Sequence, residues 1–330
     1  MKKLYASITS VGCFLPETVL SNSDLEKIVD TSDDWITTRT GIKERRILDK
    51  GIGTSYMAIK AANAIIEKKQ INPLEIDLVI VATITPDMHA TATAAFVASE
   101  IGASNAFGYD INAACSGFLY GMSTASAFIE SGRYKKVLLI GADKMSSIVD
   151  YQDRNTCIIF GDGAGAVLLE PNTNGLGVQD EYLRSDGSNR DLLRIEAGGS
   201  INPTSKETVM SKKHFIYQDG KNVFKHAVSN MSNAADQIMM RNGLTKSDVS
   251  FLVAHQANKR IIDATSNRMG IEDDKVLMNI SRYGNTTAAT IPLLLHDYES
   301  KFKKGDNIIF ASFGAGFTWG AMFLKWAYNQ

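Results

Sequence analysis

Short apolar runs alternate with longer amphipathic stretches along most of the chain. The runs 76–83 and 136–142 are rich in Val, Ile and Leu, which favours strands buried on both faces, and 107–111 is a shorter strand-like run. The stretch 118–129 is long enough for a helix and follows one of these runs directly. Strand-like and helical segments in alternation predict an α/β chain with buried, mostly parallel sheets in a layered arrangement.

The second half of the chain repeats the pattern of the first. We therefore expect two related halves, 1–172 and 173–330, packed about a pseudo-twofold axis and joined at the turn-rich stretch 171–175. Each half ends with a glycine turn and an apolar strand, at 161–169 and 314–324. Three further correspondences lie about 170 residues apart: 76–83 with 249–255, Cys115 with 284–289, and 136–142 with 306–312.

Composition and charge exclude several classes of protein. The formal net charge of −1 gives no general attraction to nucleic acid or to an anionic membrane. No apolar run approaches the roughly 20 residues that span a bilayer. The three cysteines, Cys13, Cys115 and Cys157, are odd in number and widely spaced, which argues against a disulfide framework and a cysteine zinc site. We expect a cytoplasmic protein without a bound metal.

Cys115 lies where a strand-like run passes into a helical one. The first-turn N–H groups and the dipole of that helix favour a thiolate, so we expect a lowered thiol pKa. Small neighbours, Ala113, Ala114 and Gly117, leave room for a substrate beside the sulfur. The alternative is a buried structural cysteine, since free cysteine is among the most buried residue types.

His255 and Asn285 complete a candidate constellation. His255 follows the apolar run 251–254, and the predicted pseudo-symmetry brings both residues toward Cys115. Each residue taken alone also has a purely structural explanation. His255 would be a histidine at the end of a strand, and Asn285 would be part of a Gly-Asn turn. Together they suit a thiolate that takes an acyl group from a thioester, followed by decarboxylation of a malonyl thioester. The His Nε2–H and the Asn amide would donate to the enolate oxygen, and the N–H groups of Cys115 and of 314–316 to the acyl oxyanion.

Seven motifs follow one another along the chain, at 31–36, 39–42, 114–118, 160–164, 255–258, 284–286 and 313–319. Taken in order, they resemble the β-ketoacyl-[acyl-carrier-protein] synthase III family, thiolase-fold enzymes that start bacterial type II fatty acid synthesis. The resemblance implies decarboxylative Claisen condensation of an acyl-CoA primer with malonyl-acyl carrier protein, yielding β-ketoacyl-acyl carrier protein, CoA and CO2. It implies Cys115 as nucleophile, His255 and Asn285 as decarboxylation pair, and Ala315 as a second oxyanion donor. It also implies a homodimer, with CoA thioester as substrate and no tightly bound cofactor.

The resemblance also implies binding residues. Trp35 and Arg154 would stack on the adenine of coenzyme A with help from Arg39, and Asn258 would contact the pantetheine arm. Spacing alone places Trp35 and Arg39 on one face of a helical turn, where a core tryptophan is the alternative.

Basic residues near the His255 segment form a candidate dock for an acidic carrier protein. Lys225, Lys259 and Arg260 belong to this cluster, which is otherwise read as an ordinary solvated face. Such a dock should weaken with salt.

The acyl pocket is implied to include Phe313 and, from the partner subunit of a dimer, Ala90. Ala90 and Thr91 stand where acetyl-selective family members have Phe-Pro, so we expect a deeper pocket for longer or branched primers. Ala315 replaces a glycine of the family's turn but keeps its N–H. The alternatives are a specialised thiolase-fold synthase with another primer or extender, and a non-catalytic acyl-CoA-binding protein.

Overall fold

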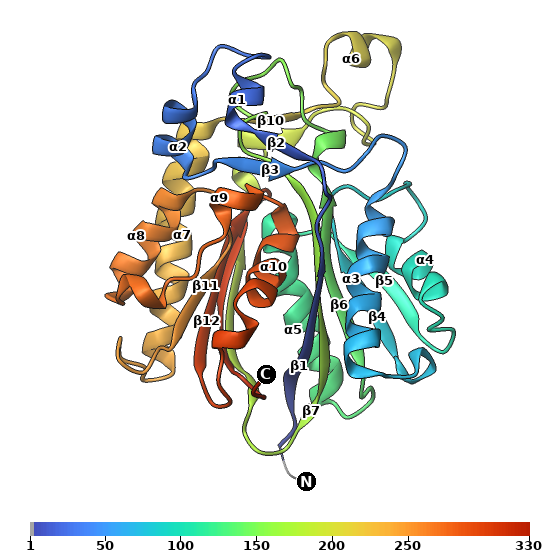
Figure 1. Cartoon of the computed structure of the whole chain (residues 1–330), viewed down its shortest axis with the longest axis vertical. Helices are drawn as coiled ribbons and strands as arrows, with labels where there is room; N and C mark the ends of the chain where they lie inside the picture. Colours follow the sequence, from blue (N-terminus) through green and yellow to red (C-terminus); the bar gives the residue numbers. More distant parts are fainter. Residues whose placement is uncertain (1–2) are drawn as a thin grey trace.

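The computed structural model describes residues 3–330, and two β-sheets run side by side through it (Figure 1). The first sheet has the strand order β1-β7-β6-β4-β5. Its strand β4 is parallel to β5 and β6, whereas β7 is antiparallel to β1 and β6. The strands are β1 (Tyr5–Phe14), β4 (Leu78–Ala82), β5 (Phe107–Ile111), β6 (Val137–Lys144) and β7 (Asp162–Asn172).

The second sheet has the strand order β11-β12-β13-β8. Only β11 and β12 are parallel, and β13 is antiparallel to both β12 and β8. Its order matches that of β4, β6, β7 and β1 in the first sheet, in keeping with the predicted duplication. The strands are β8 (Gly177–Ser185), β11 (Phe251–Ala254), β12 (Asn307–Gly314) and β13 (Thr318–Lys325).

The expectation of mostly parallel sheets was wrong in detail, because both sheets are mixed. A parallel pair needs a long crossover, whereas a short turn allows only antiparallel pairing. Strands β12 and β13 are separated by residues 315–317 alone and therefore form a hairpin. We propose the boundary of the halves at 172/173, where β7 ends and the turn to β8 begins.

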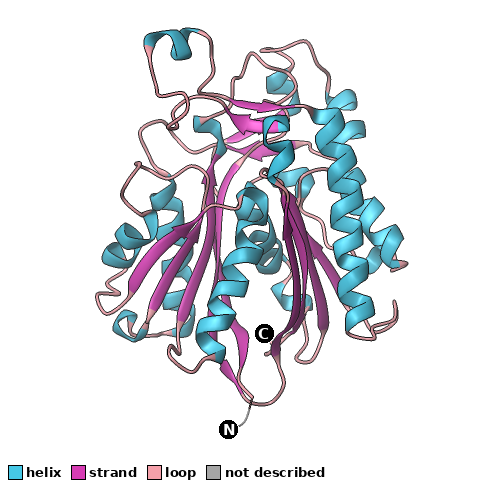
Figure 2. Ribbon diagram, turned by 180° about the vertical axis from the view of Figure 1, so that it is seen from behind, coloured by secondary structure: helices cyan, strands magenta, loops and turns pink. Residues whose placement is uncertain are grey.

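Helices fill the space between the sheets and cover their outer faces (Figure 2). Helices α5 and α10 pack between the sheets, and the largest apolar core surrounds them. Helices α3 and α4 cover the first sheet, and α7 and α8 cover the second. The helices are α3 (Thr54–Lys69), α4 (Thr93–Glu100), α5 (Gly117–Glu130), α7 (Gly220–Arg241), α8 (Lys259–Met269) and α10 (Thr290–Asp297).

Shorter elements gather at one end of the sheets, where Figure 1 shows α1, α2, α6 and two small sheets. In these sheets β2 pairs with β3 and β9 pairs with β10. Within residues 3–330, no helix combines the length and apolar character needed to cross a membrane. The short elements are β2 (Val19–Ser21), α1 (Asn22–Leu25), α2 (Asp33–Thr40), β3 (Glu44–Arg46), β9 (Leu193–Ile195), α6 (Lys206–Met210), β10 (Ile216–Gln218) and α9 (Ile280–Tyr283).

Candidate active site

Cys115 lies in a single 3₁₀ turn, Ala114–Ser116, between β5 and α5. Its residue is only 7% exposed. Ala114 has a φ of +47°, a left-handed conformation that side chains disfavour and that clusters at functional sites. The backbone of Gly314 packs against the turn so closely that a Cβ there would lie 2.7 Å from the Cys115 nitrogen. The Cys115 turn is thus held against the end of β12.

Three hydroxyl groups join the Cys115 turn to the β12–β13 hairpin. Ser312 Oγ donates to the Cys115 carbonyl at 2.8 Å, and Ser116 Oγ donates to the Thr318 carbonyl at 3.0 Å. Thr318 Oγ1 donates to the Ala113 carbonyl at 2.9 Å. Sequence reasoning missed these contacts. Their only signal is a polar residue in an apolar strand, such as Ser312, which is fully buried.

His255 follows the last residue of β11 and is 2% exposed. Its backbone N–H continues the ladder to the Ala311 carbonyl at 2.8 Å, and its Nδ1 lies 2.7 Å from Thr290 Oγ1 on α10. Thr290 Oγ1 also donates to the Thr287 carbonyl at 3.0 Å. One hydroxyl proton cannot serve both contacts, so this network assigns the imidazole proton to Nδ1.

The free atom of the His255 ring is therefore Nε2 with its lone pair. Nε2 is buried and has no hydrogen-bond partner in the described structure. The sequence interpretation gave Nε2 an N–H from the outset. In the neutral tautomer assigned here, Nε2 becomes a donor only after it has accepted a proton.

Asn285 follows Gly284, whose φ of +62° and ψ of −151° suit glycine alone. The Asn285 N–H donates to the Ile159 carbonyl at 2.9 Å, which ties this loop to the first half of the chain. Its side-chain Oδ1 accepts from the Thr287 N–H at 2.8 Å. The Nδ2 donor is left for the cavity, and a hydrogen bond from Asn285 lowers the pKa of the Cys115 thiol.

Burial controls the protonation of both titrating groups. It raises the pKa of the Cys115 thiol to about 12, with further raising by the Asp143 charge. The hydrogen bonds of the Cys115 N–H and of Asn285 lower that pKa but do not outweigh burial. Burial also lowers the pKa of His255 to about 3. The expectation of a resting thiolate was therefore wrong, because desolvation of a buried anion exceeds the effect of one helix terminus.

Asp143, at the end of β6, is a buried acid that sequence reasoning missed. It is fully buried, and burial raises the pKa of its carboxyl group. Its contacts are all donors, which suits a carboxylate that accepts only. It joins the β4 end to Thr287 and Ala288, beside Asn285. The donors are the hydroxyls of Thr83, Thr85 and Thr287 and the backbone N–H groups of Ile84, Thr85 and Ala288.

A cavity of about 560 Å³ brings the three candidate catalytic residues together. Cys115, His255 and Asn285 all line it, as do Phe313 and Ala315. A second cavity of about 490 Å³ shares Ala114 and Ala315 with the first, so the two adjoin beside the cysteine. Across residues 3–330, no group of three or more His, Cys, Asp or Glu side chains is arranged to hold a metal ion.

The candidate coenzyme A residues lie at the wall and rim of the first cavity. Trp35 and Arg39 on α2 line it, and both Arg39 and Arg154 stack on the Trp35 ring, at 4.8 and 4.6 Å from its centroid. A base inserted between Trp35 and Arg154 would have to displace that guanidinium. Asn258 also lines the cavity, where its side chain caps α8 and donates to the Arg39 carbonyl at 3.0 Å.

The three candidate docking residues differ in their surroundings. Lys225, Lys259 and Arg260 are all exposed on the packed helices α7 and α8. Lys259 forms an ion pair with Asp263 at 2.7 Å, which offsets its charge. Arg260 lines the cavity and stacks on Phe224 at 4.8 Å.

Ala90 is not at the cavity within one chain. It lies exposed between β4 and α4, with a φ of +71°, and lines neither cavity.

The chain is similar over its whole length to proteins of one known family. The family models of 3-oxoacyl-[acyl-carrier-protein] synthase III and of its C-terminal part match residues 109–187 and 239–326. A β-ketoacyl-[acyl-carrier-protein] synthase III from Bacteroides thetaiotaomicron is 55% identical, covering 100% of this chain and 98% of that protein. One from Chlorobaculum tepidum is 56% identical over 97% and 99% of the two chains.

Solved structures agree with the sequence matches. The 3-oxoacyl-[acyl-carrier-protein] synthase III of Aquifex aeolicus superimposes with a TM-score of 0.90 at 41% identity, covering 97% of this chain and 100% of that one. The priming β-ketosynthase of the R1128 polyketide pathway superimposes with the same TM-score at 32% identity, covering 98% and 97%.

Proposed function

The chain belongs to the β-ketoacyl-[acyl-carrier-protein] synthase III family, and we propose that Cys115, His255 and Asn285 carry out the condensation of that family here. The substrates are an acyl-CoA primer and malonyl-acyl carrier protein, and the products are β-ketoacyl-acyl carrier protein, CoA and CO2. The observation that carries the residue assignment is their convergence on one cavity, where His255 Nε2 is unpaired and the Asn285 side chain donates to the Cys115 thiol.

The first half-reaction acylates Cys115. His255 Nε2 accepts the thiol proton as the sulfur attacks the thioester carbonyl, so that charge separates only when the bond forms. The N–H groups of Cys115 and Ala315 hold the resulting oxyanion. Collapse of the tetrahedral intermediate breaks the bond to the CoA sulfur, and the CoA thiolate takes a proton from solvent. Because burial opposes a resting thiolate, the His255 lone pair is essential to this step.

The second half-reaction creates the carbon nucleophile. The malonyl thioester loses CO2, and the electron pair of the broken C–C bond moves into an enolate. Asn285 Nδ2 donates to the enolate oxygen, and His255 Nε2 joins it while it carries the Cys115 proton. The enolate carbon then attacks the acyl-Cys115 carbonyl, and the expelled Cys115 sulfur recovers its proton from His255.

Binding of the substrates is assigned to the rim of the cavity. Trp35, Arg39 and Arg154 receive the adenine end of coenzyme A, and Asn258 the pantetheine arm. Lys225 and Arg260 receive the acidic carrier protein, with a smaller contribution from the paired Lys259. Coenzyme A acts as a substrate in this scheme, and no tightly bound cofactor is required.

A homodimer and a cytoplasmic location complete the proposal. Strand β5 is an edge strand of the first sheet, and edge strands offer unpaired backbone groups to a second chain. Large apolar side chains are exposed on and near it, with Met88 at 69%, Phe96 at 48% and Phe107 at 42%. Cys13, Cys115 and Cys157 are free thiols, which favours a reducing compartment.

The test separates the two half-reactions. Acyl transfer from acyl-CoA is read as acylated Cys115 by peptide mass spectrometry, and decarboxylation as CO2 released from malonyl-acyl carrier protein. His255→Ala and Asn285→Ala should each slow decarboxylation about 10²- to 10³-fold, the usual loss for one such donor. His296→Ala, on the exposed side of α10, serves as the control. Decarboxylation at the normal rate in both variants would refute the assigned roles.

A specialised synthase is the second candidate, because a priming β-ketosynthase of polyketide synthesis shares the fold at 32% identity. A panel of acetyl, branched and medium-chain acyl-CoAs separates the two. A product two carbons longer than a short or branched fatty acyl primer supports fatty acid initiation. Acylation without condensation to malonyl-acyl carrier protein supports another extender.

A further inference from the structure

Gln256, next to His255, is a fully buried side chain that the proposed chemistry does not use. Its Nε2 donates to the Ala254 carbonyl at 2.8 Å, at the end of β11. Its Oε1 accepts from the backbone N–H groups of Asn279 and Ile280, both at 3.1 Å. The side chain therefore joins the strand that carries His255 to the first turn of α9, which leads directly to Asn285.

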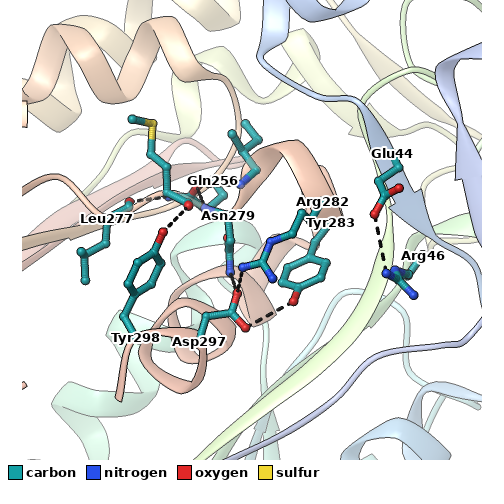
Figure 3. Close-up of polar contacts among 11 residues, drawn as sticks. Glu44, Arg46, Gln256, Leu277, Asn279, Arg282, Tyr283, Asp297 and Tyr298 are labelled. Atoms are coloured by element: carbon teal, nitrogen blue, oxygen red, sulfur yellow. Dashed lines mark hydrogen bonds and ion pairs between the residues drawn. The ribbon is translucent and has the colours of Figure 1, made fainter. Parts of the chain in front are cut away.

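A second set of contacts holds α9 against α10. Figure 3 shows Asp297 lying among Asn279, Arg282 and Tyr283. Asp297 Oδ2 accepts from Asn279 Nδ2 at 2.8 Å and from Arg282 Nη2 at 2.7 Å, and its Oδ1 accepts from the Tyr283 hydroxyl at 3.2 Å. Asp297 is the last residue of α10.

These contacts form a closed circuit that begins and ends at His255, which lines the cavity. From His255 it runs through Gln256 to α9, through Asp297 to α10, and through Thr290 back to the His255 ring. The backbone and ring of His255 are also fixed independently, by Ala311 and Thr290. Asn285 is separated from the end of α9 by Gly284 alone, so the position of its side chain relative to His255 depends on the Gln256 link.

We propose that Gln256 is a positioning residue that sets the separation of the His255 and Asn285 donors, with Asp297 bracing α9 from the other side. The inference rests on the proposed function, because it concerns the donor pair assigned there. Two donors must reach one enolate oxygen in the second half-reaction. Acylation instead uses Cys115, held by Ser312 and Thr318, and the His255 lone pair. The His255 backbone and ring are held by Ala311 and Thr290, so neither group depends on Gln256 for its position.

The test replaces Gln256 with methionine, which keeps the length of the side chain but removes both polar atoms. Gln256→Met should slow decarboxylation and the condensation kcat about 10- to 100-fold, the range expected for a small displacement of a catalytic group. The acylation rate and the KM for malonyl-acyl carrier protein should stay unchanged. Thr265→Val is the matched control, because it removes a buried hydrogen bond to the Ile261 carbonyl on α8 and should leave both half-reactions alone.

Gln256→Glu gives a readout that a purely structural role would not produce. While the introduced carboxyl group is protonated, its O–H donates to the Ala254 carbonyl and its other oxygen accepts from α9, so it loses only the longer amide contact to the Leu277 carbonyl at 3.5 Å. After ionisation, the oxygen that lost its proton faces the Ala254 carbonyl as a second acceptor. The decarboxylation rate relative to wild type should therefore be highest at low pH and fall as pH rises.

The titratable and charged groups of the circuit are His255, Arg282, Tyr283 and Asp297. All four are present both in wild type and in Gln256→Glu. Dividing by the wild-type rate at each pH removes their contribution.

The outcomes separate the inference from the proposal beneath it. Normal decarboxylation in His255→Ala and Asn285→Ala refutes the assigned donor pair. If His255→Ala and Asn285→Ala do lose decarboxylation, the donor pair stands. Equal slowing of acylation and decarboxylation in Gln256→Met would then overturn only the positioning role of Gln256. If Gln256→Met does not fold, Gln256→Glu decides the question. A decarboxylation rate that does not change with pH relative to wild type would also overturn the positioning role.

Discussion

At the scale of single residues, the resting site is a neutral thiol beside a neutral imidazole. Burial raises the pKa of Cys115 to about 12 and lowers that of His255 to about 3, so both groups are neutral in the resting enzyme. An ion pair created during attack avoids an isolated buried charge. Asp143 reinforces this state, since its negative charge further disfavours a thiolate.

Replacement of Asp143 by Asn should make Cys115 more reactive. Asp143 raises the thiol pKa, so loss of its charge lowers that pKa and increases the thiolate fraction at any pH below it. Each unit of lowering gives about tenfold more thiolate. The measurement is the rate of Cys115 alkylation by iodoacetamide as a function of pH, with alkylation located by peptide mass spectrometry.

The matched control for this prediction is Asp162→Asn. Asp162 is also fully buried and also accepts from backbone N–H groups, those of Leu48 and Ser146, but it does not act on the Cys115 pKa. An unchanged or higher Cys115 pKa in Asp143→Asn would contradict the electrostatic role.

At the scale of elements, corresponding turns of the two halves build the site. Cys115 precedes α5 and Asn285 precedes α10, each in a segment that passes through a short 3₁₀ turn. Ala114 and Thr287 have φ values of +47° and +52° at equivalent points of these turns. Two related left-handed residues on neighbouring segments agree with a duplicated unit, and such strain persists only where surrounding contacts hold it.

Gly284→Ala should destabilise the loop that carries Asn285. A Cβ at this position would lie 2.7 Å from the Ile159 carbonyl oxygen, and the φ of +62° with a ψ of −151° is costly for alanine. We expect a loss of about 2 kcal/mol or more in the free energy of unfolding. Urea denaturation measures it, and Gly199→Ala, with open space at its Cβ, should change little. Equal stability of the two variants would contradict the strain argument.

At the scale of the whole molecule, strand ends of both mixed sheets lie at one cavity, whereas Ala90, in the loop between β4 and α4, does not line it. Ala90 on this loop lines neither cavity of its own chain, so any effect on primer choice requires a second chain. The exposed edge strand β5 and its apolar neighbours offer a surface for that chain. Light scattering of the purified protein should give twice the chain mass of 36.0 kDa.

Ala90→Phe should restrict the enzyme to primers with shorter acyl groups. In a dimer, the larger side chain would fill part of the partner's acyl pocket, which Ala90 leaves open, and exclude branched or medium-chain groups before acetyl groups. The measurement is kcat/KM across an acyl-CoA series for wild type and variant. Met88→Leu, a volume-conserving change on the same loop, is the control. A primer profile that Ala90→Phe leaves unaltered would contradict the cross-subunit role.

The linear pattern of residues was enough to identify the family of this chain and to propose which residues carry its chemistry. Cys115 and His255 were predicted because each follows an apolar run, and Asn285 because it stands opposite Cys115 in the duplicated α/β chain. The family motifs then assigned a role to each residue. Periodicity and local turns are properties of neighbouring residues, so a single chain reveals them. The detailed pairing of strands was less accessible, and the expected parallel sheets proved mixed.

The protonation states and the placement of the candidate catalytic groups depend on contacts that form only when the chain folds. The sign of the Cys115 pKa shift depends on how much water the surrounding layers exclude, and a local helix-terminus argument predicted the opposite direction. The His255 tautomer depends on Thr290, which lies 35 residues away. Asp143 and Gln256 act through partners contributed by other elements. Desolvation and hydrogen bonding between distant segments exist only in the folded chain, so no local pattern of residues could have predicted them.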